Sequence, residues 1–516
     1  MEEEFIQNNE PNGLKILKFG KKKHISNKNK LHSKNIIITS LILSILLIII
    51  VLFFLLINSK SNSYIFNKES NDKNQNKIKI DNDVSELDKQ NAFALKQKLR
   101  PYPIILYFLK RTKDAFLNIF KLSKIKKEDI DVNKLVYALN KTIYNHPVLL
   151  SRYHKDDNGE IYMEYRPDLP PKIEIKNIRD EDVPKLGDHL LNTFEPFDSC
   201  LVNFTIFISE TSVYFYYDIF HSNFDGNSII FFENNLELAY LDKPLPKDYY
   251  YLNLYQFNLD MKSKKYEETV KFFQDNFDLN REYCPMFDDI PDEIKKNKTL
   301  QLINKEYSSK ELRKQLTENF GEKPRYYNIF MSMNILLTDY IFSNFVDENP
   351  TAKIGFNGRN WAKDVNSVGC LIMNYPVVYH FQDKKVNIKN YYTKIKELFE
   401  MKPKLMKFPF EHTEVHTSMW AIMQTKNFYK DTMFGKPSEL IYGYNNLINM
   451  KSEFVLSPIM QELFIDDDEV KYTYFFDGKF YKESSADRYM DILAKTSKFI
   501  MDNFNNDKDI NLENFF

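Results

Sequence analysis

The feature that most constrains the fold is an unbroken run of 22 uncharged, mostly apolar residues near the N-terminus, residues 36–57. At a helical rise of about 1.5 Å per residue, this run spans roughly 33 Å, enough to cross a bilayer core of about 30 Å. A secretory signal has a shorter apolar region and a small-residue cleavage site, and the flank at residues 58–61 offers no convincing one. The sequence therefore predicts a single uncleaved transmembrane helix, a signal-anchor.

Lysines are distributed unevenly on the two sides of this run. Eight of them lie within residues 15–34, and only three lie within residues 60–75. The positive-inside rule then predicts that residues 1–35 are a basic cytosolic tail and that the large C-terminal part is lumenal or extracellular. Asn-Lys-Thr sequons that begin at Asn140 and Asn297 are compatible with that location.

Composition divides the rest of the chain into a linker and a globular part. Residues 58–92 are polar and nearly free of aromatic side chains, which predicts a flexible stalk. The whole chain is 43% hydrophobic and carries a net charge of -1, which favours a globular protein and argues against a nucleic-acid partner. The three cysteines, Cys200, Cys284 and Cys370, do not form a disulfide framework.

Helical and strand patterns alternate in the globular part, which predicts a mixed α/β (α+β) fold too long for one simple sheet. Apolar residues recur at helical spacing over residues 132–147, after Asp131 as a plausible N-cap. The turn of a hairpin follows at Asp157-Asn158-Gly159. Further elements are predicted as strands at 202–208, 213–221, 371–380 and 470–476 and as a closing helix at 485–504.

The predicted strand at 213–221 ends at a histidine, and an aspartate and a glycine follow within five residues. Period-two alternation places Tyr217 and His221 on one face, and Asp225-Gly226 follows in a chain with only 12 glycines. Asn227 or Ser228 can then cap a helix that runs to residue 240. An imidazole at a strand end is rigidly held and exchanges a proton near neutral pH, although a satisfied core histidine before an ordinary turn would show the same letters.

Context distinguishes these alternatives. The stretch FHSNFDGNSIIFFENNLELAY, residues 220–240, resembles the His-His-x-x-x-Asp-Gly segment of nonribosomal peptide synthetase condensation domains and of the wider CoA-dependent acyltransferase superfamily. Four more stretches resemble segments of that family in the expected order, and they cover residues 131–165, 194–226, 354–380 and 470–500. The resemblance extends over about residues 95–510.

The resemblance implies two lobes, each like a chloramphenicol acetyltransferase monomer, with a tunnel between them. We place the lobes at residues 93–255 and 256–516. His221 would be the general base in the tunnel, acting on the hydroxyl or amine of an acceptor that attacks a thioester carbonyl. Asp225 and Gly226 would be structural, with Arg359 first and Arg152 second as the partner of Asp225. The implied substrate-facing positions are Tyr217, Ser222, Asn223 and Asn374.

Two departures from the family pattern narrow the reactions and the donors that can be expected. The first histidine of the motif is Phe220 here, which the strand pattern turns away from His221; this weakens a strict peptide-condensation function. The chain has no adjacent glycine pair, and we identify no carrier-protein segment or adenylation module in it. The expected donor is therefore an external thioester, acyl-CoA or a substrate on a separate carrier protein, and no bound cofactor is expected.

Other chemistries are less well supported by the sequence. His412 and His416 would share a helix face, but a zinc protease needs glutamate directly after the first histidine, where Thr413 stands. A solvated face or a wall of the second lobe explains these histidines better than a metal site. The sequence thus predicts a membrane-anchored acyltransferase. The alternative is a catalytically silent homologue that binds a ligand or a partner.

Overall fold

A computed structural model describes residues 85–109, 118–190, 192–277, 288, 290–296, 302–321, 324–357, 359, 366–401, 419–425, 431–443, 458–465 and 468–515. The predicted cytosolic tail, the transmembrane helix at 36–57, most of the stalk, and His412 and His416 lie outside these residues. Among the residues that are described, no helix is both long enough and apolar enough to cross a bilayer.

The end of the predicted stalk is helical, so the prediction of a flexible segment was wrong for residues 86–92. These residues belong to α2, Glu86–Ala94, whose N-cap Ser85 accepts a hydrogen bond from the backbone N–H of Asp88 at 3.2 Å. The Asp88 carboxylate also accepts from the Tyr249 hydroxyl at 3.2 Å. Composition suggested a linker because this segment is rich in polar residues. Polar residues such as Ser85 also cap helices, and here Ser85 caps a helix that packs against the globular part.

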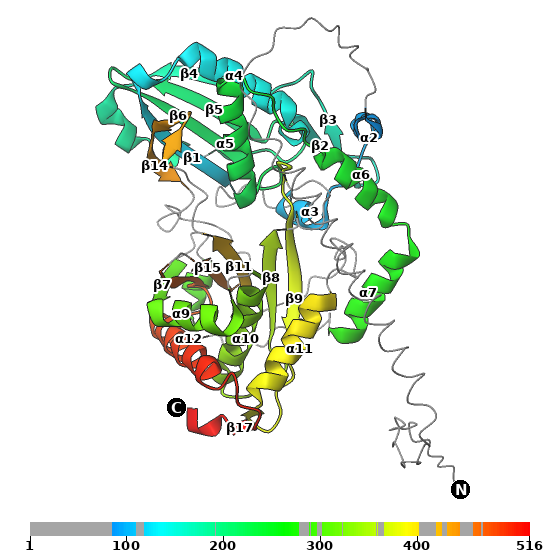
Figure 1. The fold of residues 1–516 in the computed structure, drawn as a ribbon, viewed down its shortest axis with the longest axis vertical. Helices are drawn as coiled ribbons and strands as arrows, with labels where there is room; N and C mark the ends of the chain where they lie inside the picture. The colour runs from blue at the N-terminus through cyan, green and yellow to red at the C-terminus, as the bar shows by residue number, and fades with distance from the viewer. Residues whose placement is uncertain are drawn as a thin grey trace, which may run out of the picture. The chain divides into compact units, whose positions relative to one another are not determined.

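The first sheet has five strands in the order β14-β1-β6-β5-β4, antiparallel except for the parallel pair β4 and β5 (Figure 1). Its strands are β1 Asn118–Lys126, β4 Ile173–Asn177, β5 Val202–Ile208, β6 Ser212–Phe220 and β14 Glu439–Gly443. Helices α4, Val132–Asn145, and α5, Gly226–Tyr240, pack against each other beside this sheet. Phe232 of α5 stacks on Phe204 of β5, which shows how the apolar face of the helix covers the strands.

The second sheet has six strands in the order β7-β16-β15-β11-β8-β9, in which β11 runs parallel to both of its neighbours. Its strands are β7 Leu302–Ser309, β8 Thr351–Asn357, β9 Ile372–Val378, β11 Met419–Thr425, β15 Ile459–Ile465 and β16 Val470–Asp477. Four helices accompany it: α9 Lys310–Phe320, α10 Pro324–Phe342, α11 Ile388–Met401 and α12 Glu483–Asp502. Buried hydroxyls join α10 to α12, with Thr338 Oγ1 2.8 Å from Thr496 Oγ1.

Shorter elements connect and flank the two sheets. The helices are α3 Pro103–Leu109, α6 Tyr250–Asp260, α7 Lys264–Asn276 and α8 Asp292–Lys296. The two-stranded pairs are β2 Ser151–Lys155 with β3 Ile161–Tyr165, β10 Lys385–Val386 with β17 Ile510–Asn511, and β12 Thr432–Met433 with β13 Lys436–Pro437. The β2–β3 hairpin turns at Gly159, whose φ of +85° confirms the turn that the sequence predicted.

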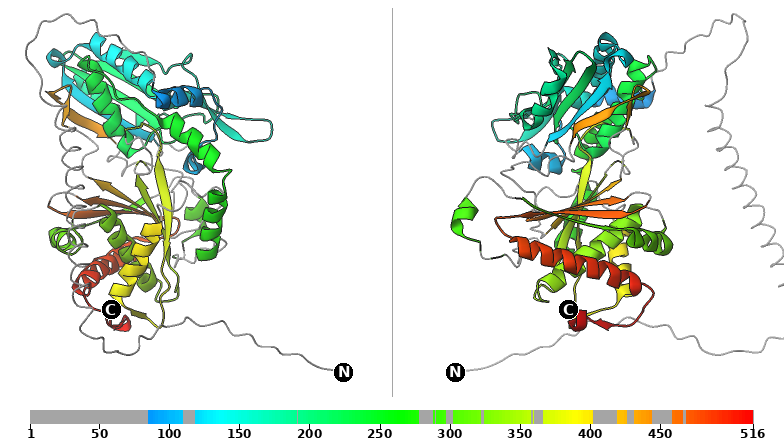
Figure 2. Two further views of the ribbon diagram at one scale, coloured as in Figure 1. Left: turned by 45° about the vertical axis from the view of Figure 1, so that its right-hand side comes forward. Right: turned by 90° about the vertical axis from the view of Figure 1, so that its left-hand side faces the viewer.

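The second half of the chain contributes to both sheets. Strand β14 pairs antiparallel with β1, so that Lys121 lies opposite Gly443 (Figure 2 shows β14 in orange beside the blue and cyan strands). A small apolar cluster also combines Phe120 and Tyr216 of the first sheet with Met460 and Phe475 of the second. Helix α6 runs through the boundary that we placed at residue 255. The described residues from Ser85 to Phe515 accordingly belong to one compact unit.

Two local predictions around β6 need correction. The strand ends at Phe220, and His221 is the first residue of the turn that follows. The N-cap of α5 is Asp225 and not Asn227 or Ser228, because the backbone of Asp225 is still extended while its Oδ1 accepts from the backbone N–H of Ser228 at 2.9 Å. Gly226 is therefore the first residue of the helix.

Candidate active site

His221 is held in a fixed position directly after β6. Its ring stacks on Phe108 of α3 with centroids 4.6 Å apart, and its Nδ1 lies 3.9 Å from the thiol sulfur of Cys370. Burial lowers the pKa of the imidazole below its usual value of 6.5, although backbone hydrogen bonds and the charge of Asp225 partly oppose this shift. The ring is thus neutral near pH 7 and is able to accept a proton.

Phe220 and His221 contact different neighbours. The Phe220 ring is fully buried and contacts Phe194, with centroids 6.2 Å apart. The two adjacent aromatic side chains therefore pack against different partners, Phe194 and Phe108, and the residue that replaces the first histidine of the family motif fills a core position.

Asp225 and Arg359 form the predicted buried ion pair. Arg359 Nη1 donates to Asp225 Oδ2 at 2.7 Å, and both side chains are 1% exposed. Burial alone would raise the pKa of the Asp225 carboxyl. The charge and hydrogen bonds of Arg359, with the backbone N–H groups of Leu371 and Ser228, outweigh that effect and lower the pKa below 3.8. The carboxylate is therefore ionised at neutral pH.

Arg152, the second predicted partner, has a different role. Its guanidinium donates to the carbonyl oxygens of Ser151 at 2.9 Å and Leu169 at 2.6 Å. The prediction that Arg152 is the alternative partner of Asp225 is therefore replaced by a role in holding the chain after β3. The local pattern could not separate the two arginines, because each lies far from Asp225 along the chain, and only the resemblance ranked Arg359 first.

The remaining predicted site residues differ in what they contact. The Tyr217 hydroxyl donates to Glu233 at 3.0 Å, and Glu233 accepts from the buried Lys121 at 2.8 Å, so Tyr217 belongs to an ion-pair network between sheet and helix. Ser222 donates to Asn223 at 2.8 Å, and Asn223 in turn donates to the Val148 carbonyl at 2.8 Å.

Ser222 and Asn223 are fully buried and thus fix the turn that carries His221. Asn374 is half-buried in β9, opposite Gly355 of β8. The substrate-facing role of Tyr217, Ser222, Asn223 and Asn374 remains a prediction.

A segment inside the resembling stretch 354–380, whose contacts the sequence did not predict, completes the site. Residues 367–371 precede β9 and carry Cys370, the thiol beside His221. Arg359 donates to the carbonyls of Ser367 at 2.8 Å and Gly369 at 3.0 Å, and Leu371 donates its backbone N–H to Asp225 at 2.9 Å. The ion pair therefore holds this segment as well as the start of α5. A glycine two residues before the predicted strand at 371–380, in a glycine-poor chain, was the available signal.

Gly369→Ala is expected to destabilise the protein strongly. Gly369 has φ of +149°, and a Cβ atom there would lie 2.2 Å from Cε2 of the Tyr250 ring. Overpacking of a buried site typically costs about 1–3 kcal/mol, and the backbone strain adds to it. Thermal unfolding of Gly369→Ala and Gly435→Ala measures the difference. Gly435 has φ of +72° but open space around its Cα, so its variant reports backbone strain alone. Equal melting temperatures for the two variants would contradict the packing argument.

Metal ligands are not grouped in the part of the chain that the structure describes: no set of three or more His, Cys, Asp or Glu side chains there could hold an ion. His412 and His416 lie outside that part. Cys200 and Cys370 are free thiols.

Comparison with known proteins identifies the fold. No protein-family model matches the chain, and no curated protein matches it by sequence. Solved structures do match. The epimerization domain from the third module of tyrocidine synthetase B is 14% identical, with a TM-score of 0.61 over 78% of this chain and 97% of that one. The starter condensation domain of rhizomide synthetase is 10% identical, with a TM-score of 0.59 over 77% and 94%.

A variant of that starter condensation domain, solved in complex with C8-CoA, has a TM-score of 0.58 at 9% identity and covers 80% of this chain and 97% of that one. These proteins share the two-sheet architecture described above over most of both chains. The chain therefore has the same fold as these condensation and epimerization domains, as the sequence resemblance predicted.

Proposed function

We propose that the protein is an acyltransferase that moves an acyl group from an external thioester to a hydroxyl or amine, with His221 as the general base. The observation that carries this proposal is a buried, neutral imidazole fixed in the turn after β6, near the Asp225–Arg359 pair. The complex of a similarly folded condensation domain with C8-CoA supports acyl-CoA as the donor class. A separate carrier protein that bears the thioester is the other candidate donor.

The chemistry assigned to His221 is one proton transfer in each direction. The neutral imidazole takes the proton of the acceptor O–H or N–H as the oxygen or nitrogen bonds to the thioester carbonyl carbon. When the tetrahedral intermediate collapses, the carbon–sulfur bond breaks and the imidazolium returns the proton to the departing thiolate. The imidazole is neutral again at the end, so the cycle needs no other reactant.

A second function is favoured by one observation. His221 is only 7% exposed and is covered on one face by Phe108, as a core histidine would be. A catalytically silent homologue that binds a ligand or a partner would retain such a residue. The discriminating experiment incubates the full-length protein with a panel of acyl-CoA donors and with alcohols or amines, and it measures release of free CoA. If no pair gives release above the level of His221→Gln, the silent homologue is the better description.

We also propose that residues 36–57 anchor the protein in a membrane, with the acyltransferase fold on the lumenal or extracellular side. The lysine asymmetry supports this orientation. In sealed vesicles, added protease is expected to leave the fold intact, and detergent should make it susceptible. Digestion of the fold from the cytosolic side while the vesicles remain sealed would contradict the orientation.

A further inference from the structure

Residues 367–371 are held against His221 by two buried carboxylates. Asp225 accepts from the N–H of Leu371 at 2.9 Å, and Asp248 accepts from the N–H of Val368 at 3.0 Å. Cys370 lies between these two anchors, so the position of its thiol beside the imidazole depends on both. The first anchor belongs to the Asp-Gly segment quoted above, whereas the second lies outside every stretch that carries the resemblance.

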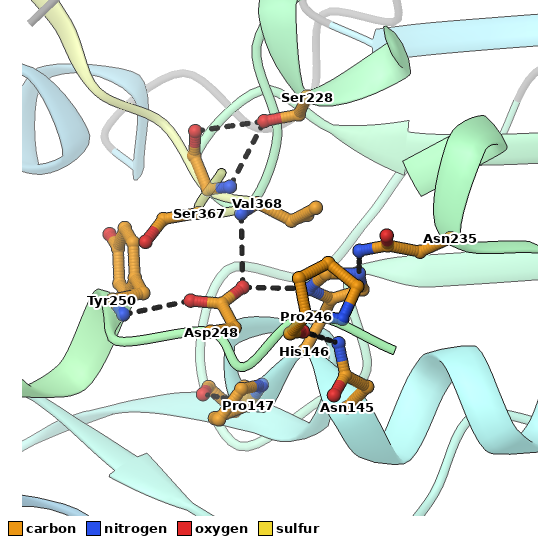
Figure 3. Close-up of polar contacts among 12 residues, drawn as sticks. Asn145, His146, Pro147, Ser228, Asn235, Pro246, Asp248, Tyr250, Ser367 and Val368 are labelled. Carbon is orange, nitrogen blue, oxygen red and sulfur yellow. Dashed lines mark hydrogen bonds and ion pairs between the residues drawn. The ribbon is translucent and has the colours of Figure 1, made fainter. Parts of the chain in front are cut away.

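Asp248 is oriented by His146 (Figure 3). His146 Nδ1 lies 2.7 Å from Asp248 Oδ2, its Nε2 lies 2.9 Å from Asn235 Nδ2, and the side chains of the histidine and the aspartate are fully buried. An amide nitrogen only donates, so in this arrangement Nε2 accepts and the proton of a neutral ring sits on Nδ1, from which it is donated to Asp248. The tautomer thus follows from the orientation of Asn235.

The His146–Asp248 pair joins separate parts of the fold. His146 is the C-cap of α4, and Asn235 lies in α5. Asp248 precedes α6, and its Oδ1 accepts from the backbone N–H of Tyr250 at 2.8 Å, which fixes the start of that helix. Tyr250 supplies a second contact to the same segment, because its ring lies where a side chain on Gly369 would have to be.

We propose that His146 and Asp248 are positioning residues of the site, which hold residues 367–371, and with them Cys370, against the imidazole of His221. They act through the backbone of Val368 and not at the reacting atoms. The expected effect on the rate rests on the proposed acyl transfer. A displacement of about 1 Å around a reacting group can lower the rate of such a reaction by about 10²-fold. The placement of Cys370, by contrast, is measurable without any substrate.

The experiment compares His146→Phe with His146→Asn in the full-length protein. Phenylalanine keeps a ring but cannot donate to Asp248, whereas the asparagine amide can still donate from a position close to that of Nδ1. Alkylation by iodoacetamide is followed at each cysteine by peptide mass spectrometry, with the half-buried Cys200 as internal reference. In His146→Phe, iodoacetamide is expected to alkylate Cys370 roughly tenfold faster or more than in the wild type, because local opening exposes the thiol. In His146→Asn, the alkylation rate of Cys370 should stay near that of the wild type.

Kinetics with the donor–acceptor pair from the screen supply the second measurement. His146→Phe is expected to lower kcat by roughly 10–10²-fold with little change in KM, and His146→Asn should restore most of it. The matched control is His154→Gln, which removes another histidine–aspartate contact, to Asp198, from a partly exposed position in β2. This control should change neither the alkylation of Cys370 nor kcat.

A second variant keeps the inference testable if His146→Phe does not fold. Asp248→Asn preserves shape but cannot accept from Val368, Tyr250 and His146 together, so Cys370 should again become more reactive. Alkylation of Cys370 at the wild-type rate in the folded variants would overturn the inference. Faster alkylation in a protein with no acyl transfer would instead support the positioning role and reject the proposed function.

Discussion

His221→Gln and His221→Ala are both expected to lower kcat for acyl transfer by roughly 10²–10⁴-fold, the usual contribution of a positioned general base. The imidazole is buried and stacks on Phe108, so the alanine variant also leaves a cavity and should melt at a lower temperature. The glutamine variant keeps most of the volume and isolates the chemical loss. Turnover and thermal melting of both variants check the prediction.

Phe220→His is the matched control for His221. It recreates the two-histidine motif of the family, but its side chain enters the position now packed against Phe194, whereas His221 packs against Phe108. Its kcat is expected to stay close to that of the wild type, although its stability should fall. Near-native turnover in His221→Gln would reject the catalytic role of His221 and favour the silent homologue.

Arg359→Met is expected to cost about 3–5 kcal/mol in the free energy of unfolding, because it leaves the Asp225 carboxylate buried without its cation. Asp225→Asn should lower stability and activity as well, since it removes the charge that Arg359 neutralises and loosens residues 367–371. Chemical denaturation of both variants measures the loss. The two effects should not add in the double variant, because each single change already breaks the same pair.

An exposed ion pair provides the comparison for this large effect. Lys471 and Glu306 lie 2.8 Å apart on neighbouring strands, with side chains 38% and 45% exposed. Lys471→Met is expected to cost no more than about 1 kcal/mol, because solvent screens such pairs. If Arg359→Met costs as little as Lys471→Met, then the buried pair does not hold the site together.

Local features of the fold could be predicted from sequence because the residues that cause them are neighbours in the chain. Asp131 does cap α4, accepting from the N–H of Asn133 at 2.9 Å, and the β2–β3 turn lies at Gly159. The cap of α5 was missed by two or three residues, since Asp, Asn and Ser are all good caps and only the backbone conformation selects one.

Contacts between distant residues were predictable only where a family resemblance supplied them. The Asp225–Arg359 pair joins residues 134 positions apart, and the resemblance ranked that arginine first. Nothing in the local pattern marks Cys370 as the neighbour of His221, or Asp248 as the partner of His146, although these pairs shape the same site. These pairs can be recognised only in the folded structure, where separate elements bring together buried polar groups that need hydrogen-bond partners.

The pairing of β14 with β1 has a consequence for how the chain folds while it is being synthesised. Strand β1 ends at Lys126 and its partner ends at Gly443, so a growing chain adds 317 further residues before the pairing is possible. At ordinary elongation rates this takes roughly 15–60 s. During that interval one edge of β1 presents unpaired backbone groups, which is the kind of surface that recruits other strands or chaperones. A truncation before residue 439 would make this transient exposure permanent, and an isolated first half of the protein is therefore expected to aggregate.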